Sequence, residues 1–156
     1  MSISTLINKT THSYCLLTKV LNMTAPILDI VLRLWVAKVF FQSGLTKIQS
    51  WDTTIMLFQY EYNVPILSPE IAAYLGTAAE LTLPVLLLIG FISRPTALAL
   101  FIFNYIAMIS YGDISPAGIN DHIMWGVMLA VTFFHGPGKL SLDHWLCHKL
   151  SNSSAK

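Results

Sequence analysis

Long apolar stretches constrain this chain most, because they reach the length that crosses a lipid bilayer. The stretch VLRLWVAKVFFQSGLTK covers residues 31–47, and IAAYLGTAAELTLPVLLLIGFI covers residues 71–92. A hydrocarbon core of about 30 Å requires about 20 residues of helix. Hydrophobic residues make up 54% of the chain and charged residues only 11%, outside the range of ordinary soluble domains. The sequence therefore predicts an integral membrane protein.

Four spans are expected, and they predict an all-α fold, an integral membrane four-helix bundle. The predicted spans are residues 26–47, 71–92, 96–111 and 120–135. Pro26 is expected in the first turn of the first span, Ser93 as the cap of the third with Pro95 behind it, and Asn120 as the cap of the fourth. The chain is accordingly divided into an N-terminal segment 1–25, a membrane domain 26–138 and a tail 139–156.

The basic residues of the short connections predict the orientation, because cytoplasmic loops are enriched in lysine and arginine. With both termini inside, the cytoplasmic side holds Lys9, Lys19, Arg94, Lys139, Lys149 and Lys156. The outer connections then hold Lys47 against Asp52, Glu61, Glu70, Asp113 and Asp121. The N-terminal residues lack the pattern of a removable signal peptide. We therefore expect a multi-pass protein with both termini in the cytoplasm.

Two segments outside the spans are expected to lie on the membrane surface. Residues 49–70 are rich in aromatic side chains, which favour the bilayer interface, and are predicted to form an outer capping loop. The tail sequence SLDHWLCHKL has apolar residues at helical spacing. It predicts a short amphipathic C-terminal helix at the inner interface.

Polar side chains in the middle of the predicted spans are the candidates for function. Lys38, Glu80 and Asn104 come from three spans and lie near one depth. An isolated charge there costs about 3 to 10 kcal/mol, which pairing reduces, so Lys38 and Glu80 are the predicted pair and the candidate catalytic residues. Pro84 has no amide hydrogen to give the carbonyl of Glu80, so a bend is expected there.

Arg33 and Lys38 are expected to belong to different sites, because the two side chains lie about 140° apart around the helix. Asp29 stands one turn before Arg33 and can pair with it. The candidate ligand-binding residues are Arg33, Lys38, Glu80 and Asn104. The alternative is that such residues only fix the helix register, a role that suits Asn104 and Gln42.

Other site classes find little support in the sequence. Cys15 and Cys147 are isolated, and the H-x-x-C-H pattern of His144, Cys147 and His148 lacks a third ligand, so no metal site is predicted. Matching histidines on facing spans, which a haem would need, are not evident. No phosphate loop, nucleophile elbow or nucleic-acid surface is present.

Charged and glycine residues follow three patterns along the chain. Arg33, Phe40, Gly44 and Lys47 form the pattern R-x6-F-x3-G-x2-K on one face of the first span. Glu80 with Gly90 and Arg94 forms E…G-x3-R in the second span. The closing pattern G-P-G-x-x-S-x-D is formed by Gly136, Pro137, Gly138, Ser141 and Asp143. Together these patterns resemble those of the DoxX family of small four-span membrane proteins. The resemblance extends from about residue 28 to residue 146, and the stretch 43–81 is similar to a proteobacterial branch.

The resemblance implies a location in the bacterial inner membrane and a redox-linked role. Members include a subunit of an archaeal thiosulfate:quinone oxidoreductase and membrane partners of redox-defence proteins, and some branches neighbour genes for metal-binding peptide systems. The predicted function is therefore that of a redox-linked membrane component that binds a quinone or another lipophilic ligand near Glu80 and Lys38. Quinone is the candidate cofactor. The expected partners are the lipid bilayer and redox or metal-handling proteins. Whether the chain is an enzyme, and its oligomeric state, stay open.

Two alternatives come from the residues themselves. A mid-membrane Glu80 can alternate between a proton and a substrate, as in a small proton-coupled transporter, although the long aromatic outer loop is a poor gate. A non-catalytic scaffold that holds a partner subunit through the outer loop or the tail is the other possibility.

Overall fold

The all-α prediction is confirmed for the part of the chain that the computed structural model describes, which is residues 3–153 with the side chains of residues 7 and 11–151. Lys156 and the side chain of Lys9, used above for the orientation, lie outside it. Within this part, six helices and no sheet are present: α1 (Ile3–Gln49), α2 (Trp51–Tyr60), α3 (Pro69–Ile89), α4 (Ser93–Ser110), α5 (Pro116–His135) and α6 (Leu142–Ser153).

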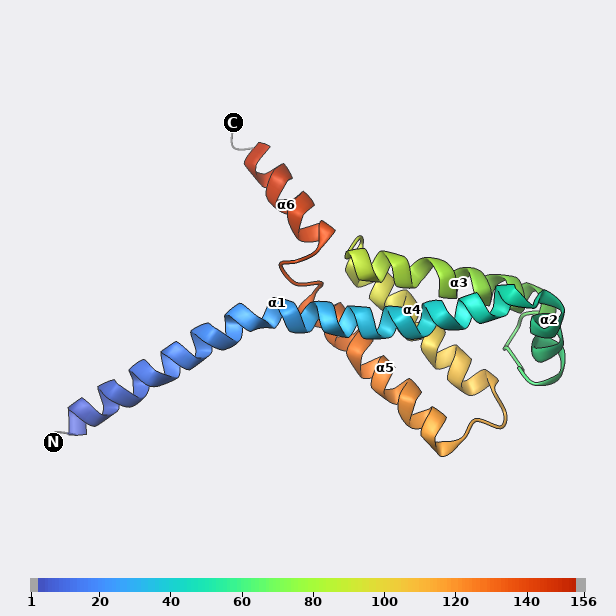
Figure 1. The fold of residues 1–156 in the computed structure, drawn as a ribbon, viewed down its shortest axis with the longest axis horizontal. Helices are drawn as coiled ribbons and strands as arrows, with labels where there is room; N and C mark the ends of the chain where they lie inside the picture. The colour runs from blue at the N-terminus through green and yellow to red at the C-terminus, as the bar shows by residue number, and fades with distance from the viewer. Residues whose placement is uncertain (1–2, 154–156) are drawn as a thin grey trace.

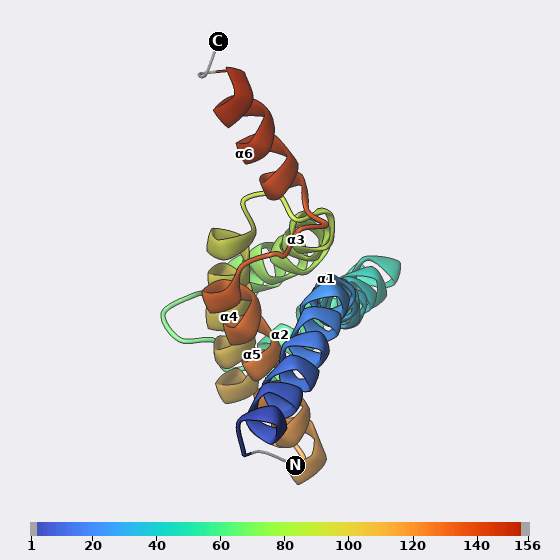
Figure 2. The ribbon, with the colours of Figure 1, turned by 90° about the vertical axis from the view of Figure 1, so that its left-hand side faces the viewer.

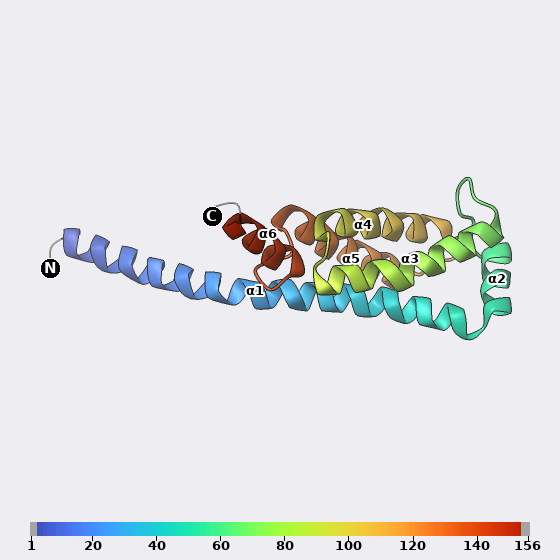
Figure 3. The same cartoon turned by 90° about the horizontal axis from the view of Figure 1, so that it is seen from above.

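Four of these helices lie alongside one another, as Figures 1 and 2 show for α1, α3, α4 and α5. Helix α2 lies across one end of this group, between the end of α1 and the start of α3 (Figure 3). Helix α6 leaves the opposite end (Figure 1). Among the described helices, α1, α3 and α5 are long and apolar enough to cross a membrane.

The first helix starts much earlier than the sequence predicts. Pro26 was expected in the first turn, but it lies inside α1, a continuous helix of 47 residues. A proline inside a helix removes one hydrogen bond and bends the axis without necessarily ending it. Figure 1 shows α1 changing direction before it reaches the other helices, so its N-terminal half projects beyond them.

The helix starts at α4 and α5 also differ from the prediction. Ile92, in the left-handed region with φ of 47°, precedes α4, and Ser93 makes no side-chain cap. Helix α5 begins at Pro116, where the Ser115 hydroxyl accepts a hydrogen bond from the Gly118 amide, so Asn120 is not the cap. A Ser-Pro pair before a helix competes better for the cap than an internal asparagine. Helix α5 ends at His135, the predicted end of the fourth span, and Gly136 is its C-cap.

Two apolar clusters hold the helices together. The larger contains Val36, Phe40, Leu87, Ala97, Leu100 and Leu129. The smaller joins α2 and the following loop to the start of α3, through Phe58, Ala72, Ala73, Trp51, Ile55, Tyr62 and Val64. The aromatic segment 49–70 therefore packs over the end of the bundle. Exposed large apolar side chains are frequent along the outer faces of α1, α3, α4 and α5, as lipid contact requires.

Candidate ligand site

The site begins with the close approach of α1 and α3 at Gly44. A Cβ atom at this position would lie 2.9 Å from the Leu81 side chain and 3.0 Å from the Glu80 Cβ atom. Glycine therefore lets the two helices meet at a distance that any larger residue would increase. The contact fixes the helix register and brings the Glu80 carboxylate against α1.

Glu80 is held there by Lys47. The Lys47 ammonium lies 2.8 Å from Oε1 and 2.6 Å from Oε2 of Glu80, and 2.9 Å from the Ser43 hydroxyl. Ser43 in turn donates to Glu80 Oε1 over 3.1 Å. The side chains of Lys47 and Glu80 are 12% and 8% exposed, so this is a buried ion pair. All three ammonium hydrogens have an acceptor.

The predicted pairing of Glu80 with Lys38 is wrong. Lys38 is exposed, whereas Phe40 and Gly44 are buried and Lys47 is partly buried on the face that packs against α3. The estimate of depth failed because α1 has no boundary at Pro26 from which to find a midpoint. In addition, a helical side chain points back toward the N-terminus, so the ammonium of Lys47 reaches the level of Ser43 and Glu80.

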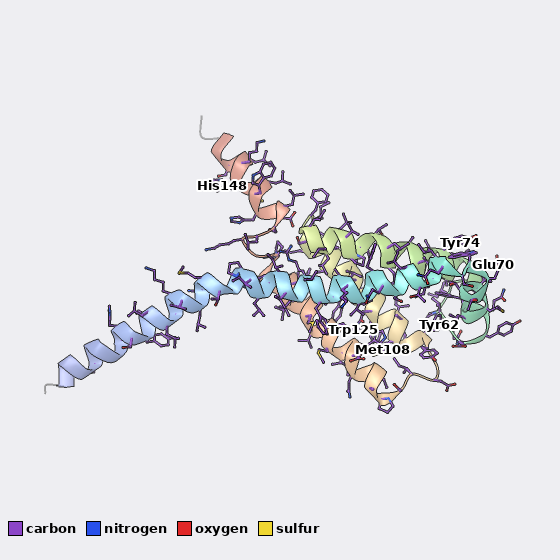
Figure 4. The ribbon with its side chains drawn as sticks, in the orientation of Figure 1. Tyr62, Glu70, Tyr74, Met108, Trp125 and His148 are labelled. Atoms are coloured by element: carbon purple, nitrogen blue, oxygen red, sulfur yellow. The ribbon has the colours of Figure 1, made fainter. Side chains whose placement is uncertain are left out.

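A cavity of about 510 Å³ adjoins the ion pair, and we call it the central cavity. Its walls come from α1, α2, α3, α4 and α5 and are mostly aliphatic and aromatic. Its polar lining residues are Ser43, Lys47, Tyr62, Glu80, Ser110, Tyr111 and His122. Two of its lining residues are labelled in Figure 4: Tyr62 near α2, and Trp125 on α5 in the middle of the bundle.

The central cavity opens on the outer surface of the bundle between α3 and α4. Leu75 of α3 and Ile102 of α4 both line it, yet they are 56% and 50% exposed. Ala79 and Ala99, which are smaller, line it beside them. If α3 crosses the bilayer, this opening faces acyl chains instead of water.

The α4 and α5 side of the cavity carries a second polar group, His122. Asn104 Nδ2 donates to the backbone carbonyl of His122 over 2.9 Å, and Asn104 Oδ1 lies 2.8 Å from His122 Nδ1. The ring of His122 packs edge-on against Trp125, with centroids 4.9 Å apart. Asn104 thus links α4 to α5 and orients the histidine.

Arg33 lies away from the cavity, at the opposite end of the bundle. It is 1% exposed and donates to three backbone carbonyls: Asp29 at 3.4 Å, Leu88 at 3.2 Å and Leu140 at 2.7 Å. These contacts tie α1 to the end of α3 and to the chain before α6. The carboxylate of Asp29, expected to pair with Arg33, instead lies 3.2 Å from Nδ1 of His135.

The tail closes this end through Asp143. Its carboxylate accepts hydrogen bonds of 2.8 Å from the amides of Ile92 and Ser93, and its own amide donates to the Gly90 carbonyl over 2.9 Å. A residue 50 positions away therefore provides the cap that α4 lacks locally. Burial raises the pKa of Asp143, but the hydrogen bonds from Ser93 and Ile92 and the charge of Arg33 outweigh it, so its pKa is lowered.

A lowered pKa predicts a loss of stability in acid. The contribution of Asp143 is complete above the unfolded-state pKa of about 3.9 and disappears as the pH falls through the lower folded-state pKa. We expect Asp143→Asn to reduce the free energy of unfolding at pH 7 and to flatten its dependence on pH below about 4. Chemical unfolding in detergent at several pH values measures this. Asp113→Asn, an exposed loop change, is the control and should keep the wild-type slope.

Most of these contacts lie in a region of the chain that matches a known protein family. The DoxX family profile matches residues 28–112, which contain the Gly44 contact, the Lys47–Glu80 pair and the turn at Gly90. The chain belongs to the DoxX family. An uncharacterized protein of Haemophilus influenzae is 32% identical over 122 residues, which cover 73% of this chain and 80% of the relative. The inner membrane protein YphA of Escherichia coli is 30% identical over 132 residues, covering 76% and 89%. No solved structure matches the chain.

The structure shows where the residues of the three sequence patterns lie. Arg33, Phe40, Gly44 and Lys47 all face the interior of the bundle, on one face of α1. Gly90 ends α3 with φ of 71°. Arg94 is exposed, with its guanidinium beside Gly136. In the closing motif, Ser141 accepts from the His144 amide at the start of α6, and Gly138 packs on the carboxylate of Asp29.

Of the four predicted ligand-binding residues, Glu80 alone lines the central cavity. Arg33 holds the other end, Lys38 is exposed, and Asn104 lies behind His122. The sequence did not predict Lys47 and His122 as ligand-site residues, although Lys47 lies on the same helix face as Arg33, Phe40 and Gly44. Figure 4 places His148, on α6, away from Tyr62 and Trp125. Among the described residues, no three His, Cys, Asp or Glu side chains gather as a metal site.

Proposed function

We propose that this DoxX protein spans the bacterial inner membrane four times, with both termini in the cytoplasm. Helix α4 joins α3 to α5 through residues 90–92 and 111–115, so if both neighbours cross, α4 must return between them. Its polar Asn104 is paired inside the bundle with the backbone carbonyl of His122, so this side chain does not oppose a crossing. The similarity to YphA, which is named as an inner membrane protein, supports this location. The segment 1–25 and the tail 139–156 would then be cytoplasmic, with α6 at the interface.

We further propose that the bundle binds a lipid-soluble ring compound, a quinone or its hydroquinone, in the central cavity. The observation that carries this proposal is the cavity itself, about 510 Å³ with apolar walls and a buried ion pair. Ligand sites typically measure about 300 to 1,000 Å³, with a few placed polar groups. An opening between α3 and α4 admits a molecule from the bilayer, and an isoprenoid tail can remain in that opening.

A redox-linked role follows from the chemistry of such a ligand. Oxidation of a hydroquinone releases two protons and two electrons. The carboxylate of Glu80, held by Lys47 and Ser43, is an acceptor for a proton from a bound ring hydroxyl. A partner protein would take the electrons, so the chain is proposed as the membrane component of a redox system.

The test fills the cavity without touching the ion pair. Ala99→Phe places a phenyl ring in the opening, whereas Leu98→Phe, one residue earlier, faces away and does not line the cavity. Protein purified from native membranes is extracted with solvent, and quinones are quantified by mass spectrometry. We expect the wild type and Leu98→Phe to retain quinone near one per chain. Ala99→Phe should bind quinone about ten-fold more weakly, which corresponds to roughly 1.4 kcal/mol of binding free energy.

The proposal fails if the wild type carries no more quinone than lipid alone. It also fails if folded Ala99→Phe retains as much as the control. Thermal unfolding of both variants in detergent establishes that each is folded.

A second candidate, a scaffold for a partner subunit, is favoured by the projecting half of α1. Tyr14, Leu16, Leu17, Val20 and Leu21 are each more than half exposed there. A stoichiometric protein that copurifies with the wild type and is lost with Leu17→Gln and Leu21→Gln would support it. Ala99→Phe would leave that partner in place.

A further inference from the structure

The hydrogen bonds of Asn104 determine which nitrogen of His122 carries a hydrogen. A backbone carbonyl can only accept, so the nitrogen of the Asn104 amide must face the His122 carbonyl, 2.9 Å away. Its oxygen therefore faces Nδ1 of His122 at 2.8 Å. Because that oxygen also only accepts, Nδ1 must bear the hydrogen.

The other ring nitrogen, Nε2, is then an acceptor. In a neutral imidazole one nitrogen donates and the other accepts. Neither the Lys47–Glu80 nor the His135–Asp29 ion pair includes His122, so neither holds it in a charged form. No hydrogen bond to Nε2 exists in this part of the chain, and the residue lines the central cavity.

The opposite side of the cavity also offers acceptors instead of donors. The three hydrogens of Lys47 point to Glu80 and Ser43, and the hydroxyl hydrogen of Ser43 points to Glu80. The lone pairs of the carboxylate remain for a ligand. Burial and the charge of Glu80 raise the pKa of Tyr62, so its hydroxyl stays protonated and can donate or accept. Among the cavity groups whose hydrogen-bonding role is fixed, those that remain available to a ligand are mostly acceptors.

We propose that His122 is a specificity residue that accepts a hydrogen bond from a ring hydroxyl, so that the cavity prefers a hydroquinone to the corresponding quinone. This inference rests on the proposed function. A hydroxyl satisfies the Nε2 lone pair, whereas a quinone carbonyl has no hydrogen to give and leaves two acceptors facing each other. Asn104 acts as a positioning residue, because it holds the ring of His122 in the accepting form.

The test compares three ligands with the same ring skeleton, of which only one carries hydroxyl hydrogens. Full-length protein in lipid nanodiscs is titrated without oxygen with 1,4-dihydroxynaphthalene, 1,4-naphthoquinone and 1,4-dimethoxynaphthalene. The dimethyl ether is redox-inert and separates hydrogen bonding from ring oxidation. We expect the diol to bind about ten-fold more tightly than the other two, as one hydrogen bond to a buried acceptor predicts.

His122→Phe keeps a ring against Trp125 but removes the acceptor, and we expect it to abolish the preference for the diol. His12→Phe makes the same change at an exposed position of α1 and should bind like the wild type. If the wild type binds the diol and the quinone equally, this inference is wrong and the proposed function stands. If none of the three compounds binds, both this inference and the proposed function are wrong. Should His122→Phe not fold, the wild-type comparison decides alone.

Discussion

Lys47→Met is expected to lower the free energy of unfolding by about 3 to 5 kcal/mol, because it leaves the carboxylate of Glu80 buried and unpaired. The same substitution at Lys38, on the same helix but exposed, leaves no buried carboxylate unpaired and should cause no comparable loss. Unfolding of the purified protein by SDS in mixed micelles measures both values. The two lysines lie on one helix, but only Lys47 is paired with Glu80, so the comparison of the two variants tests the ion pair.

A double replacement refines this prediction. Removing both charges in Lys47→Met with Glu80→Leu should recover most of the lost stability, because no unpaired charge then remains. A large loss from Lys38→Met, or none from Lys47→Met, would show that the ion pair seen between α1 and α3 does not support the fold.

Gly90→Ala should be nearly as damaging, with a loss of more than about 3 kcal/mol from backbone strain and overlap together. Gly90 has φ of 71°, a conformation that side chains with a Cβ atom rarely adopt. The added Cβ atom would lie 2.5 Å from Nη1 of Arg33 and 2.6 Å from the Ser141 Cβ atom. It would therefore displace the groups that join α1, α3 and the tail.

Gly112→Ala is the matched control, because a Cβ atom there meets nothing within 4 Å. The same unfolding titration, together with the yield of monodisperse protein in detergent, compares the two. Equal stability of the two variants would contradict the packing of Arg33 and Ser141 around Gly90.

The site could be predicted in part from the helix period. Arg33, Phe40, Gly44 and Lys47 share one face, and that face is the one packed in the bundle. Glu80 was identified as a buried carboxylate from its depth alone. Its partner was not, because the sequence does not show which face of α1 packs on α3, and Lys47 lies nine positions beyond Lys38 on another face of the helix. The register of the two helices depends on the contact of Gly44 with Leu81.

Contacts between distant residues were beyond sequence reasoning for the same reason. Asp143 caps α4 from 50 positions away, whereas the local sequence predicted Ser93 as the cap. Asn104 was predicted to lie inside the bundle, but its hydrogen bonds to His122 depend on how α4 packs on α5. The opening between α3 and α4 likewise follows from where the two helices separate.

By itself, the sequence determined that this chain is helical, suits a lipid environment and belongs to the DoxX family, because apolar length and residue spacing are properties of one segment at a time. The tertiary structure alone decided that Lys47 neutralises Glu80, that Arg33 and Asp143 close the other end, and that His122 borders a cavity. Each of these depends on the relative position of two helices, and that position is set by packing at a few small residues.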